Sequence, residues 1–489
     1  MSTHLRVAIV HYHLKRGGVT RVIESTLRGL KQSSSKAPVS AVVLAGEVPE
    51  DFPYQEQAHA VEGLHYSNSQ ANTPDPETLL EQLRITARKA LGGEPDLWHI
   101  HNHSLGKNEA MPGVVSLLAE AGEALLLQIH DFAEDGRPSN YSSNLQNSRF
   151  VDKLYPLGER VHYGLINGRD YTLFAENNIP ETQRHQLPNP VEADPAPSDA
   201  KSVTAIRSEL GADKLFLYPV RALRRKNLGE LLLWSALAQP GEVFATTLGA
   251  TNPNYQQTYL DWQSLARHHH LPACFGIGET SKHPFPAFMQ AADCILTTSI
   301  AEGFGLSFLE PWLFGKPVAG RDLPEITADF TQQGIKLDTL YRKLPIPDSW
   351  IQEDVLHAAI RKHLNLAYTA YGRELGPDAM EKAIISIRPT EDSYDFGALN
   401  ESLQSAVIER LAKHPEARQE LPCQTFSIPK PRDQARMIEE NFSLDAFTQR
   451  LKKLYQHITE KPTSEIDYLP PGKILDSFLM PERFRLLRT

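Results

Sequence analysis

Short hydrophobic runs alternate along the chain with stretches of helical periodicity. In the first 130 residues the runs are mostly apolar, as in strands that a parallel sheet buries on both faces. Between them, residues 78–90 and 113–121 carry apolar side chains at helical spacing. This alternation predicts a parallel α/β sheet, in which ligands bind at the carboxyl ends of the strands. The expected strands are Arg6–His11, Val39–Leu44, Leu97–His101 and Ala124–His130.

A pair of glycines follows the first expected strand. Gly17 and Gly18 predict a tight turn, and the apolar residues Val22, Ile23 and Leu27 then mark one face of a helix. A strand, a glycine turn and a helix N-terminus form a place where backbone amides can meet a phosphate. Many such turns are only connections, so this pattern alone leaves both interpretations open.

The segment KLFLYPVRALRRKNLGELLLWSAL repeats the strand–loop–helix pattern with a basic loop. The strand is expected to end near Val220, and Arg221 and Lys226 lie five residues apart across the loop. Fixed cations at such a place stabilise developing negative charge. A solvated surface loop would explain the same residues.

Residues 297–327, TTSIAEGFGLSFLEPWLFGKPVAGRDLPEIT, are the most informative stretch. Glu302 precedes a glycine-rich turn, and LSFLEPWLF, with Leu306 at its start, has helical spacing that places Glu310 about two turns on. Gly303 and Gly305 keep side chains out of the turn, so that free amides can face an anion. The two carboxylates could meet the sugar and the ribose of a nucleotide-sugar, or they could be solvated.

Two glutamates separated by seven residues, with Gly303–Phe304–Gly305 after the first and GKPV further on, closely resemble the signature of retaining glycosyltransferases of family four. The resemblance implies an α/β fold of the GT-B kind, with two Rossmann-like domains facing across a cleft. It also implies site residues. The expected catalytic residues are His130, Arg221, Lys226 and Glu302, and the expected donor-binding residues are Gly17, Gly18, Phe275, Gly276, Gly303, Phe304, Gly305, Leu306 and Glu310.

The residues around His130 extend this expectation to the acceptor. In the family a histidine after this strand contacts the donor sugar, and Asp131 and Arg137 could meet the acceptor. His99, His101 and His103 alternate before it, but no carboxylate accompanies them, so we expect cleft-edge residues rather than a metal triad. The three consecutive histidines from His268 are expected at an exposed helix end. No metal is expected, because Arg221, Lys226 and two helix N-termini would neutralise the phosphates. No cofactor is expected, because the nucleotide-sugar is a substrate.

The expected domains are residues 1–190 on the acceptor side and residues 201–455 on the donor side. A proline-rich segment, residues 179–199, reads as the hinge. Residues 328–400 depart from the family pattern and predict a mainly helical insertion that shapes the acceptor site or an oligomer contact. The tail, residues 456–489, is expected to cross back to the first domain. Pro311 is expected to kink the helix that carries Glu310.

Composition narrows the class of protein. The 489 residues have a net charge of −10, which argues against broad nucleic-acid binding. Three scattered cysteines, no signal peptide and no apolar run of membrane-spanning length lead us to expect a cytoplasmic protein. Six basic residues between Lys15 and Lys36 could contact an anionic membrane surface, but a solvated helix face explains them equally and the acidic chain opposes such contact.

We therefore expect a retaining glycosyltransferase that moves a sugar from a nucleotide-sugar to a hydroxyl of a small-molecule or lipid-linked acceptor. A UDP-sugar is favoured, and a GDP-sugar is the alternative. The other interpretations are a nucleotide-sugar epimerase or a phosphorylase on the same fold, and a non-catalytic nucleotide-sugar-binding protein.

Overall fold

The chain forms two compact units, which we describe separately. The computed structural model describes residues 4–33, 38–67, 73–145, 149–193, 200–422, 428, 432–470 and 472–488. Unit 1 comprises Met1–Pro190, Ala370–Gly372 and Glu440–Met480, and unit 2 comprises Val191–Thr369, Arg373–Glu439 and Pro481–Thr489. Part of the expected hinge, residues 194–199, lies outside the described residues.

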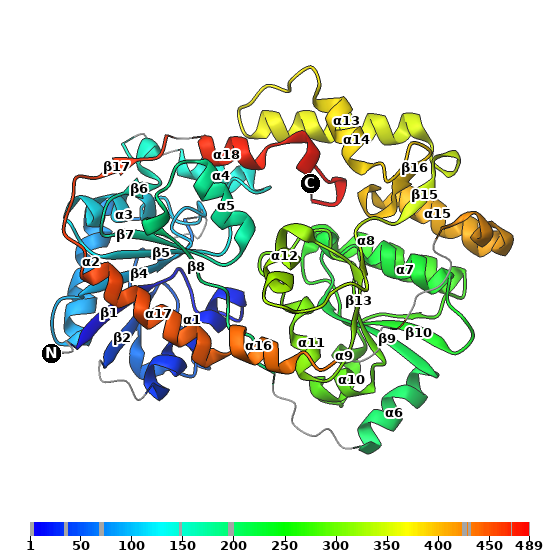
Figure 1. Cartoon of the computed structure of the whole chain (residues 1–489), viewed down its shortest axis with the longest axis horizontal. Coiled ribbons are helices and arrows are strands. Elements are labelled where there is room, and N and C mark those ends of the chain that lie inside the picture. Colours follow the sequence, from blue (N-terminus) through cyan, green and yellow to red (C-terminus); the bar gives the residue numbers. More distant parts are fainter. Residues whose placement is uncertain are drawn as a thin grey trace. The chain divides into compact units, whose positions relative to one another are not determined.

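Unit 1 is built on a seven-stranded parallel sheet with helices on both faces (Figure 1). The strand order is β3-β2-β1-β4-β5-β7-β8, so the direction of winding reverses between β1 and β4. Such a reversal is where doubly wound sheets bind ligands. The strands are β1 (Leu5–Val10), β2 (Val39–Ala45), β3 (Ala58–Ala60), β4 (Leu97–His101), β5 (Leu125–Ile129), β7 (Val161–Leu165) and β8 (Arg184–Gln186).

Alternate residues of these strands supply two hydrophobic cores. Val7 and Ile9 of β1 face one core, and Ala8 and Val10 face the other, as expected of strands with a side-chain period of two. Helices cover both faces because each contributes one apolar stripe. The helices of unit 1 are α1 (Gly18–Gln32), α2 (Pro76–Leu91), α3 (Met111–Glu120), α4 (Pro138–Asn144), α5 (Gly168–Glu176), α17 (Leu444–Thr459) and α18 (Lys473–Phe478).

The domain to which α17 belongs differs from the one that we expected. We expected residues up to 455 to close the second domain, but α17 packs beside α1 in unit 1 (Figure 1). Its apolar stripe, which includes Phe447, Leu451 and Ile458, is buried against the sheet face that α1 covers. The tail then pairs β17 (Asp467–Tyr468) with β6 (Pro156–Leu157) in unit 1, and residues from Pro481 onward belong to unit 2.

Unit 2 has a six-stranded parallel sheet with the order β11-β10-β9-β12-β13-β14, so that its winding reverses between β9 and β12. The strands are β9 (Lys214–Arg221), β10 (Glu242–Leu248), β11 (Ala273–Cys274), β12 (Cys294–Thr297), β13 (Val318–Arg321) and β14 (Leu340–Tyr341). The helices are α6 (Ala200–Leu210), α7 (Leu228–Ala236), α8 (Pro253–His268), α9 (Ile277–Thr280), α10 (Phe285–Ala291), α11 (Glu310–Leu313), α12 (Pro324–Gln332), α13 (Glu353–Ala370), α14 (Ala379–Ile387), α15 (Glu401–Lys413) and α16 (Ala435–Phe442).

The block from 328 to 400 is part of the core of unit 2 rather than an added surface. Strand β14 extends the main sheet, and β15 (Pro345–Pro347) pairs with β16 (Ser393–Asp395). Leu344, Ile346 and Tyr394 are buried in the same hydrophobic core as α7 and α15. Helices α13 and α14 supply the expected helical content, but the burial of these residues shows that the block is not an added surface.

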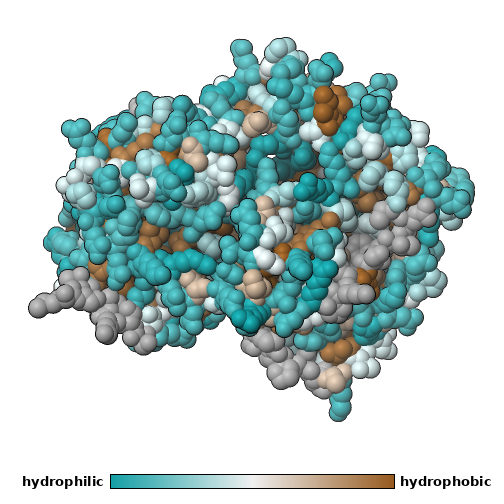
Figure 2. Space-filling model, in the orientation of Figure 1, coloured by the Kyte–Doolittle hydropathy of each residue, from teal (hydrophilic) through white to brown (hydrophobic). Residues whose placement is uncertain are grey.

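The visible surface of both units is mostly hydrophilic, with scattered hydrophobic residues (Figure 2). Among the described residues, no helix is long and apolar enough to cross a bilayer. In the basic segment before α1, Lys15 pairs with Glu47 and Arg16 pairs with Asp51, which offsets part of the local positive charge. Lys36 lies outside the described residues.

Candidate active site

The loops after β9 and β12 meet at the carboxyl edge of the unit 2 sheet. The two strands are adjacent and parallel, so both of these loops leave the same edge at the point where the winding reverses. The backbone amide of Ile300 in the second loop donates to the carbonyl of Arg225 in the first. Thr298 Oγ1 also donates to the carbonyl of Lys226 at 2.9 Å. The two predicted motifs are therefore one structural feature.

Glu302 is the centre of this feature. Its carboxylate accepts hydrogen bonds from Lys226 Nζ and from Arg225 Nη1, the second at 2.8 Å. Ser299 Oγ donates to the same carboxylate at 2.5 Å, and Tyr218 OH lies 2.6 Å from Ser299 Oγ. The side chains of Lys226 and Glu302 are 12% and 10% exposed. Lys226 and Glu302 are thus nearly buried, and the second cation, Arg225, is 40% exposed.

The charges in this group are mutually dependent. Burial would raise the pKa of Glu302, but Lys226 and Arg225 outweigh it and hold that pKa at about 2. Burial lowers the pKa of Lys226, and the attraction of Glu302 opposes that change. Glu302 is therefore ionised at neutral pH, and the side chains of Arg225, Lys226 and Glu302 together carry a net charge of +1. The group can accept a further anion.

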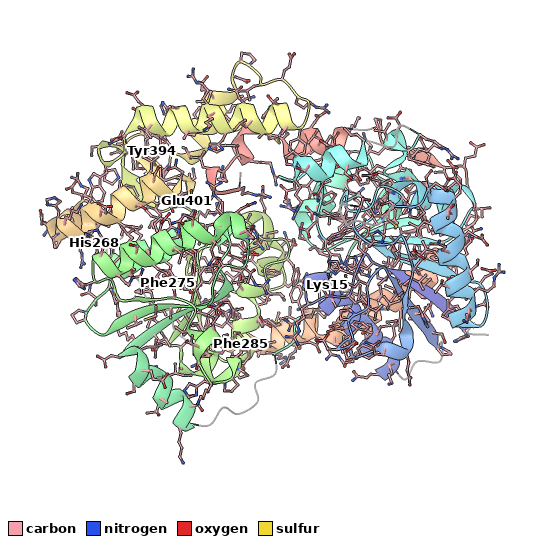
Figure 3. All side chains as sticks on the ribbon, turned by 180° about the vertical axis from the view of Figure 1, so that it is seen from behind. Lys15, His268, Phe275, Phe285, Tyr394 and Glu401 are labelled. Atoms are coloured by element: carbon pink, nitrogen blue, oxygen red, sulfur yellow. The ribbon has the colours of Figure 1, made fainter. Side chains whose placement is uncertain are left out.

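The first residue of the Arg224–Lys226 turn has another role. Arg224 forms two hydrogen bonds to Glu401 at the start of α15, at 2.6 and 2.9 Å; Glu401 is labelled in Figure 3. At the other end of the turn, Asn227 has a left-handed φ of 51° and its Oδ1 accepts from Gln404 at 2.9 Å. Helix α15 thus anchors both ends of the basic turn.

Arg221, the other predicted cation, is exposed at the last position of β9. The structure brings Lys226 and Glu302 together with Arg225, and among the described residues Arg221 makes no ion pair with them. The donor-binding role of Arg221 stays a prediction. Arg225, which we did not predict as a site residue, is the second cation on Glu302.

The glycine-rich turn leads to a broken helix rather than a continuous one. A 3₁₀ turn spans Leu306–Phe308, and α11 starts at Glu310. Pro311 lies in the first turn of α11, where its missing N–H costs no helical hydrogen bond, so it starts a helix instead of kinking one. Gly305 has a φ of 91°, and a Cβ there would lie 2.9 Å from Ile326 Cγ2. Glu310 is half-buried beyond this turn.

The remaining donor-binding candidates of unit 2 lie at the same sheet edge. Phe275 follows β11 and its ring packs edge-on against Tyr259, with centroids 5.8 Å apart (labelled in Figure 3). The Gly276 amide donates to Thr246 Oγ1 at 3.2 Å. Phe304 differs, because its ring is buried against Phe330 of α12. Gly303 and Leu306 are only partly exposed.

In unit 1, His130 follows β5 and is held by the end of β4. Its Nε2 lies 3.0 Å from His101 Nδ1, and its backbone amide donates to Asn102 Oδ1 at 2.7 Å. Burial, together with the charge of His99, lowers the pKa of His130 to about 3, so the ring is neutral. His130 is only 7% exposed.

The alternating histidines before it are not cleft-edge residues, contrary to our expectation. His99, His101 and His103 are each at most 1% exposed, because β4 is an interior strand. His99 lies between Tyr455 OH and Gln128 Oε1, at 2.8 and 2.9 Å. Within the described ranges no group of three His, Cys, Asp or Glu side chains could hold a metal ion. His268 ends α8 at an exposed position.

The predicted acceptor residues Asp131 and Arg137 come together. Arg137 Nη2 lies 2.5 Å from Asp131 Oδ1, and the Arg137 amide donates to Tyr371 OH at 2.6 Å. Tyr371 OH in turn donates to the carbonyl of Ala133 at 3.0 Å. Tyr371 thus fixes the loop that carries both predicted residues.

The glycine pair starts α1, with Gly17 as the N-cap residue in an extended conformation. A Cβ at Gly18 would meet nothing within 4 Å, and one at Gly17 would meet only the Lys15 carbonyl at 3.7 Å. The surrounding fold therefore does not require glycine at either position. Close approach of a ligand remains the predicted reason for them.

Arg321, at the end of β13, is a structural residue. Its guanidinium is 5% exposed and lies between Glu230 and Asp395, with Asp395 Oδ2 at 2.9 Å. Tyr341 OH also donates to Glu230 at 2.8 Å. This buried network joins β13, α7 and β16. Sequence reasoning missed Glu230, Asp395, Glu401 and Gln404, since nothing in their local pattern signals a distant partner.

No protein-family model matches the chain. Over 346 residues it is 27% identical to mannosylglucosyl-3-phosphoglycerate synthase of Petrotoga mobilis, a match that covers 66% of each chain. The chain thus spans just under two thirds of that relative's length.

Several solved structures share the fold. Anabaena Alr3699/HepE in complex with UDP and glucose has a TM-score of 0.52 and 13% identity, covering 93% of this chain and all of that one. A glycosyltransferase from Rickettsia africae has a TM-score of 0.55 and 14% identity, covering 94% and 99%. Sucrose-phosphate synthase from Thermosynechococcus elongatus has a TM-score of 0.51 and 13% identity, covering 93% and 99%.

These findings confirm the predicted fold class, which is α/β with two Rossmann-like domains of the GT-B kind. The resemblance to glycosyltransferases is likewise confirmed by the curated relative and by the solved structures. Assignment to family four and a retaining mechanism stay predictions.

Proposed function

We propose that this protein is a glycosyltransferase that moves a sugar from a nucleotide-sugar to a hydroxyl group of an acceptor, with retention of the anomeric configuration. The observation that carries the proposal is the cluster of Arg225, Lys226 and Glu302 at the carboxyl ends of β9 and β12. The glycosyltransferase relative and the shared GT-B fold support it.

The cluster suits the chemistry of a departing nucleoside diphosphate. As the bond between the anomeric carbon and the phosphate oxygen breaks, negative charge collects on that oxygen. Arg225 and Lys226 are already held by Glu302, so they can stabilise this charge without reorganising. The acceptor oxygen bonds to the anomeric carbon from the face that the diphosphate leaves, and the phosphate oxygen takes the acceptor's proton. The reaction requires no metal ion, since these cations supply the positive charge.

The choice of substrates rests on the relatives. A UDP-sugar is the favoured donor because HepE has been solved with UDP and with UDP-glucose, and a GDP-sugar is the alternative. The name of the curated relative describes a sugar-bearing phosphoglycerate as its product. This favours a small-molecule acceptor over a lipid-linked one.

The test has two stages. Thermal unfolding with UDP-, GDP- and ADP-sugars identifies the donor, because a ligand of the folded state raises the midpoint. Transfer is then measured as released nucleoside diphosphate, and the anomeric proton coupling of the product reports retention. Lys226→Ala should lower turnover by roughly 10²–10³-fold. Lys413→Ala, which removes an exposed lysine paired with Glu409, is the matched control.

Two outcomes would contradict the proposal. Stabilisation by a nucleotide-sugar without diphosphate release for any acceptor would indicate a binding protein. A product with inverted configuration would refute the retaining mechanism.

A further inference from the structure

Two consecutive residues at the end of β4 hold His130 in place. Asn102, in a left-handed conformation with a φ of 54°, accepts hydrogen bonds from the backbone amides of His130 and Asp131, at 2.7 and 3.2 Å. The planes of the His101 and His130 rings lie at only 20° to each other, and the rings meet edge to edge, with centroids 5.2 Å and facing nitrogens 3.0 Å apart. Both the backbone and the ring of His130 are therefore fixed from the same strand end.

The surroundings of His101 determine which of its nitrogens carries the proton. His101 is 1% exposed, and its Nε2 is buried with no hydrogen-bond partner among the described residues. Burial and three neighbouring histidines lower the pKa of His101, so the ring is neutral and has one N–H. A buried N–H without an acceptor is rarer and costlier than a buried lone pair without a donor. The proton therefore belongs on Nδ1, which faces His130 Nε2 at 3.0 Å.

The position of the proton on His101 also determines which ring nitrogen of His130 is protonated. If His101 Nδ1–H donates, His130 Nε2 is the acceptor. A neutral imidazole with an unprotonated Nε2 carries its proton on Nδ1. His130 would then present only a hydrogen-bond donor, its Nδ1–H, to a ligand.

We propose that His101 is a positioning residue that fixes His130 in the Nδ1–H tautomer, so that His130 meets its ligand as a hydrogen-bond donor. The partner is an oxygen acceptor, a sugar hydroxyl or a phosphate oxygen. That choice of ligand rests on the proposed glycosyltransferase function, whereas the tautomer does not.

The tautomer can be measured on the full-length protein without any substrate. In protein labelled with 15N-histidine, two-bond 1H–15N correlation spectra distinguish Nδ1–H from Nε2–H rings. The His130 signals are assigned by their absence in His130→Asn. We expect a neutral ring with the proton on Nδ1 at pH 7.5. A proton on Nε2 would overturn the proposal, whatever the activity of the protein.

Two variants at position 101 separate positioning from packing. His101→Asn keeps an amide that can donate to His130 Nε2, and His101→Leu removes the donor. The leucine variant should give a mixture of His130 tautomers and about a tenfold higher KM for the donor sugar, the scale of one lost hydrogen bond. The asparagine variant should keep the Nδ1–H form and most of the activity.

His103→Leu is the matched control. His103 lies just beyond the same strand end and is equally buried, but it bonds to the carbonyl of Leu154 at 3.0 Å rather than to His130. It should leave the His130 tautomer unchanged. A folded His101→Leu protein that retains a pure Nδ1–H signal would overturn the proposal, and if that variant does not fold, the wild-type and His101→Asn spectra decide.

Discussion

Arg224 and Glu401 form a two-bond ion pair that ties the basic turn after β9 to the first turn of α15. The pair divides three consecutive basic residues into two roles. Arg224 holds the turn, while Arg225 and Lys226 face Glu302. One turn further along α15, Gln404 holds Asn227. The position of the charged cluster therefore depends on a helix far away in the sequence.

Glu401→Ala should weaken the binding of the nucleoside diphosphate by about tenfold. This is the scale of one lost hydrogen bond between charged groups. The basic turn loses one of its two anchors, while the core of unit 2 is unchanged. Isothermal titration with the diphosphate measures the effect. Glu409→Ala on the same helix, which breaks only an exposed pair with Lys413, is the control. Equal affinities in the two variants would show that α15 does not position the turn.

Glu302 and Glu310 should have separable effects. Glu302→Gln keeps the shape but frees Lys226 and Arg225 from a carboxylate, so the free nucleoside diphosphate should bind as well as before or more tightly while sugar transfer falls. Glu310→Ala should weaken the free diphosphate and the donor alike, because we predict that it holds the ribose. Titration of both ligands into both variants decides. The same loss for both ligands in both variants would contradict this division.

Much of the fold was readable from the sequence because it depends on local pattern. The apolar run Leu97–His101 matched β4 residue for residue, and the Glu302 motif gave a correct view of a strand, a turn and a helix at the sheet edge. Such features need only nearby residues. The same local patterns predicted Lys226 and Glu302 as site residues, and the structure places these two side chains in contact.

The predictions failed at residues whose environment is set by contacts with residues far away in the sequence. The segment from Leu340 to Tyr394 read as an added surface because its apolar residues have no strong period, yet they fill the main core of unit 2. The structural role of Arg321 could not be predicted, because its partners Glu230 and Asp395 lie more than 70 residues away in the sequence. His101 looked like an edge residue because sequence cannot show that β4 is covered on both faces.

Unit 1 should lose stability in mild acid. Among the histidines of unit 1, burial lowers the pKa to about 3 for His11 and His130 and to about 4 for His99, His103, His162 and His185, and the pKa of His101 is also low. The unfolded chain takes up protons at these rings below about pH 6.5, so stability is full above that pH and falls as the pH drops. At pH 5 the loss is on the order of 2 kcal/mol for each imidazole. Four carboxyl groups act in the opposite sense, because burial raises the pKa of Glu134 to about 7 and also raises the pKa of Glu24, Glu123 and Asp170, but the seven histidines outnumber them.

Urea unfolding at pH 7.5 and pH 5 checks this prediction. His103→Gln should reduce the difference in stability between the two pH values, because it removes one of these buried histidines. His268→Gln, at the exposed end of α8, should leave the difference unchanged. Equal stability of the wild type at both pH values would contradict the prediction.

Tyr371→Phe should impair use of the acceptor while sparing the donor. The lost hydroxyl bridges the Arg137 amide and the Ala133 carbonyl, and the ring that remains still packs edge-on against Tyr141, with centroids 5.4 Å apart. The loop with Asp131 and Arg137 should therefore loosen without collapsing. We expect the KM of the acceptor to rise by about tenfold, the scale of one or two lost buried hydrogen bonds. The KM of the nucleotide-sugar should change less than twofold, since Arg225, Lys226 and Glu302 lie in the loops after β9 and β12.

Steady-state kinetics with each substrate varied in turn measure the effect of Tyr371→Phe. Tyr163→Phe is the matched control, because it removes another buried hydroxyl in unit 1, one that donates to the Pro156 carbonyl at 2.7 Å, away from the loop. That control should lose stability and keep its acceptor KM. An unchanged acceptor KM in a folded Tyr371→Phe protein would show that the loop does not meet the acceptor. A matching rise in both substrates' KM values would place the effect of Tyr371 on the whole protein instead of on acceptor binding.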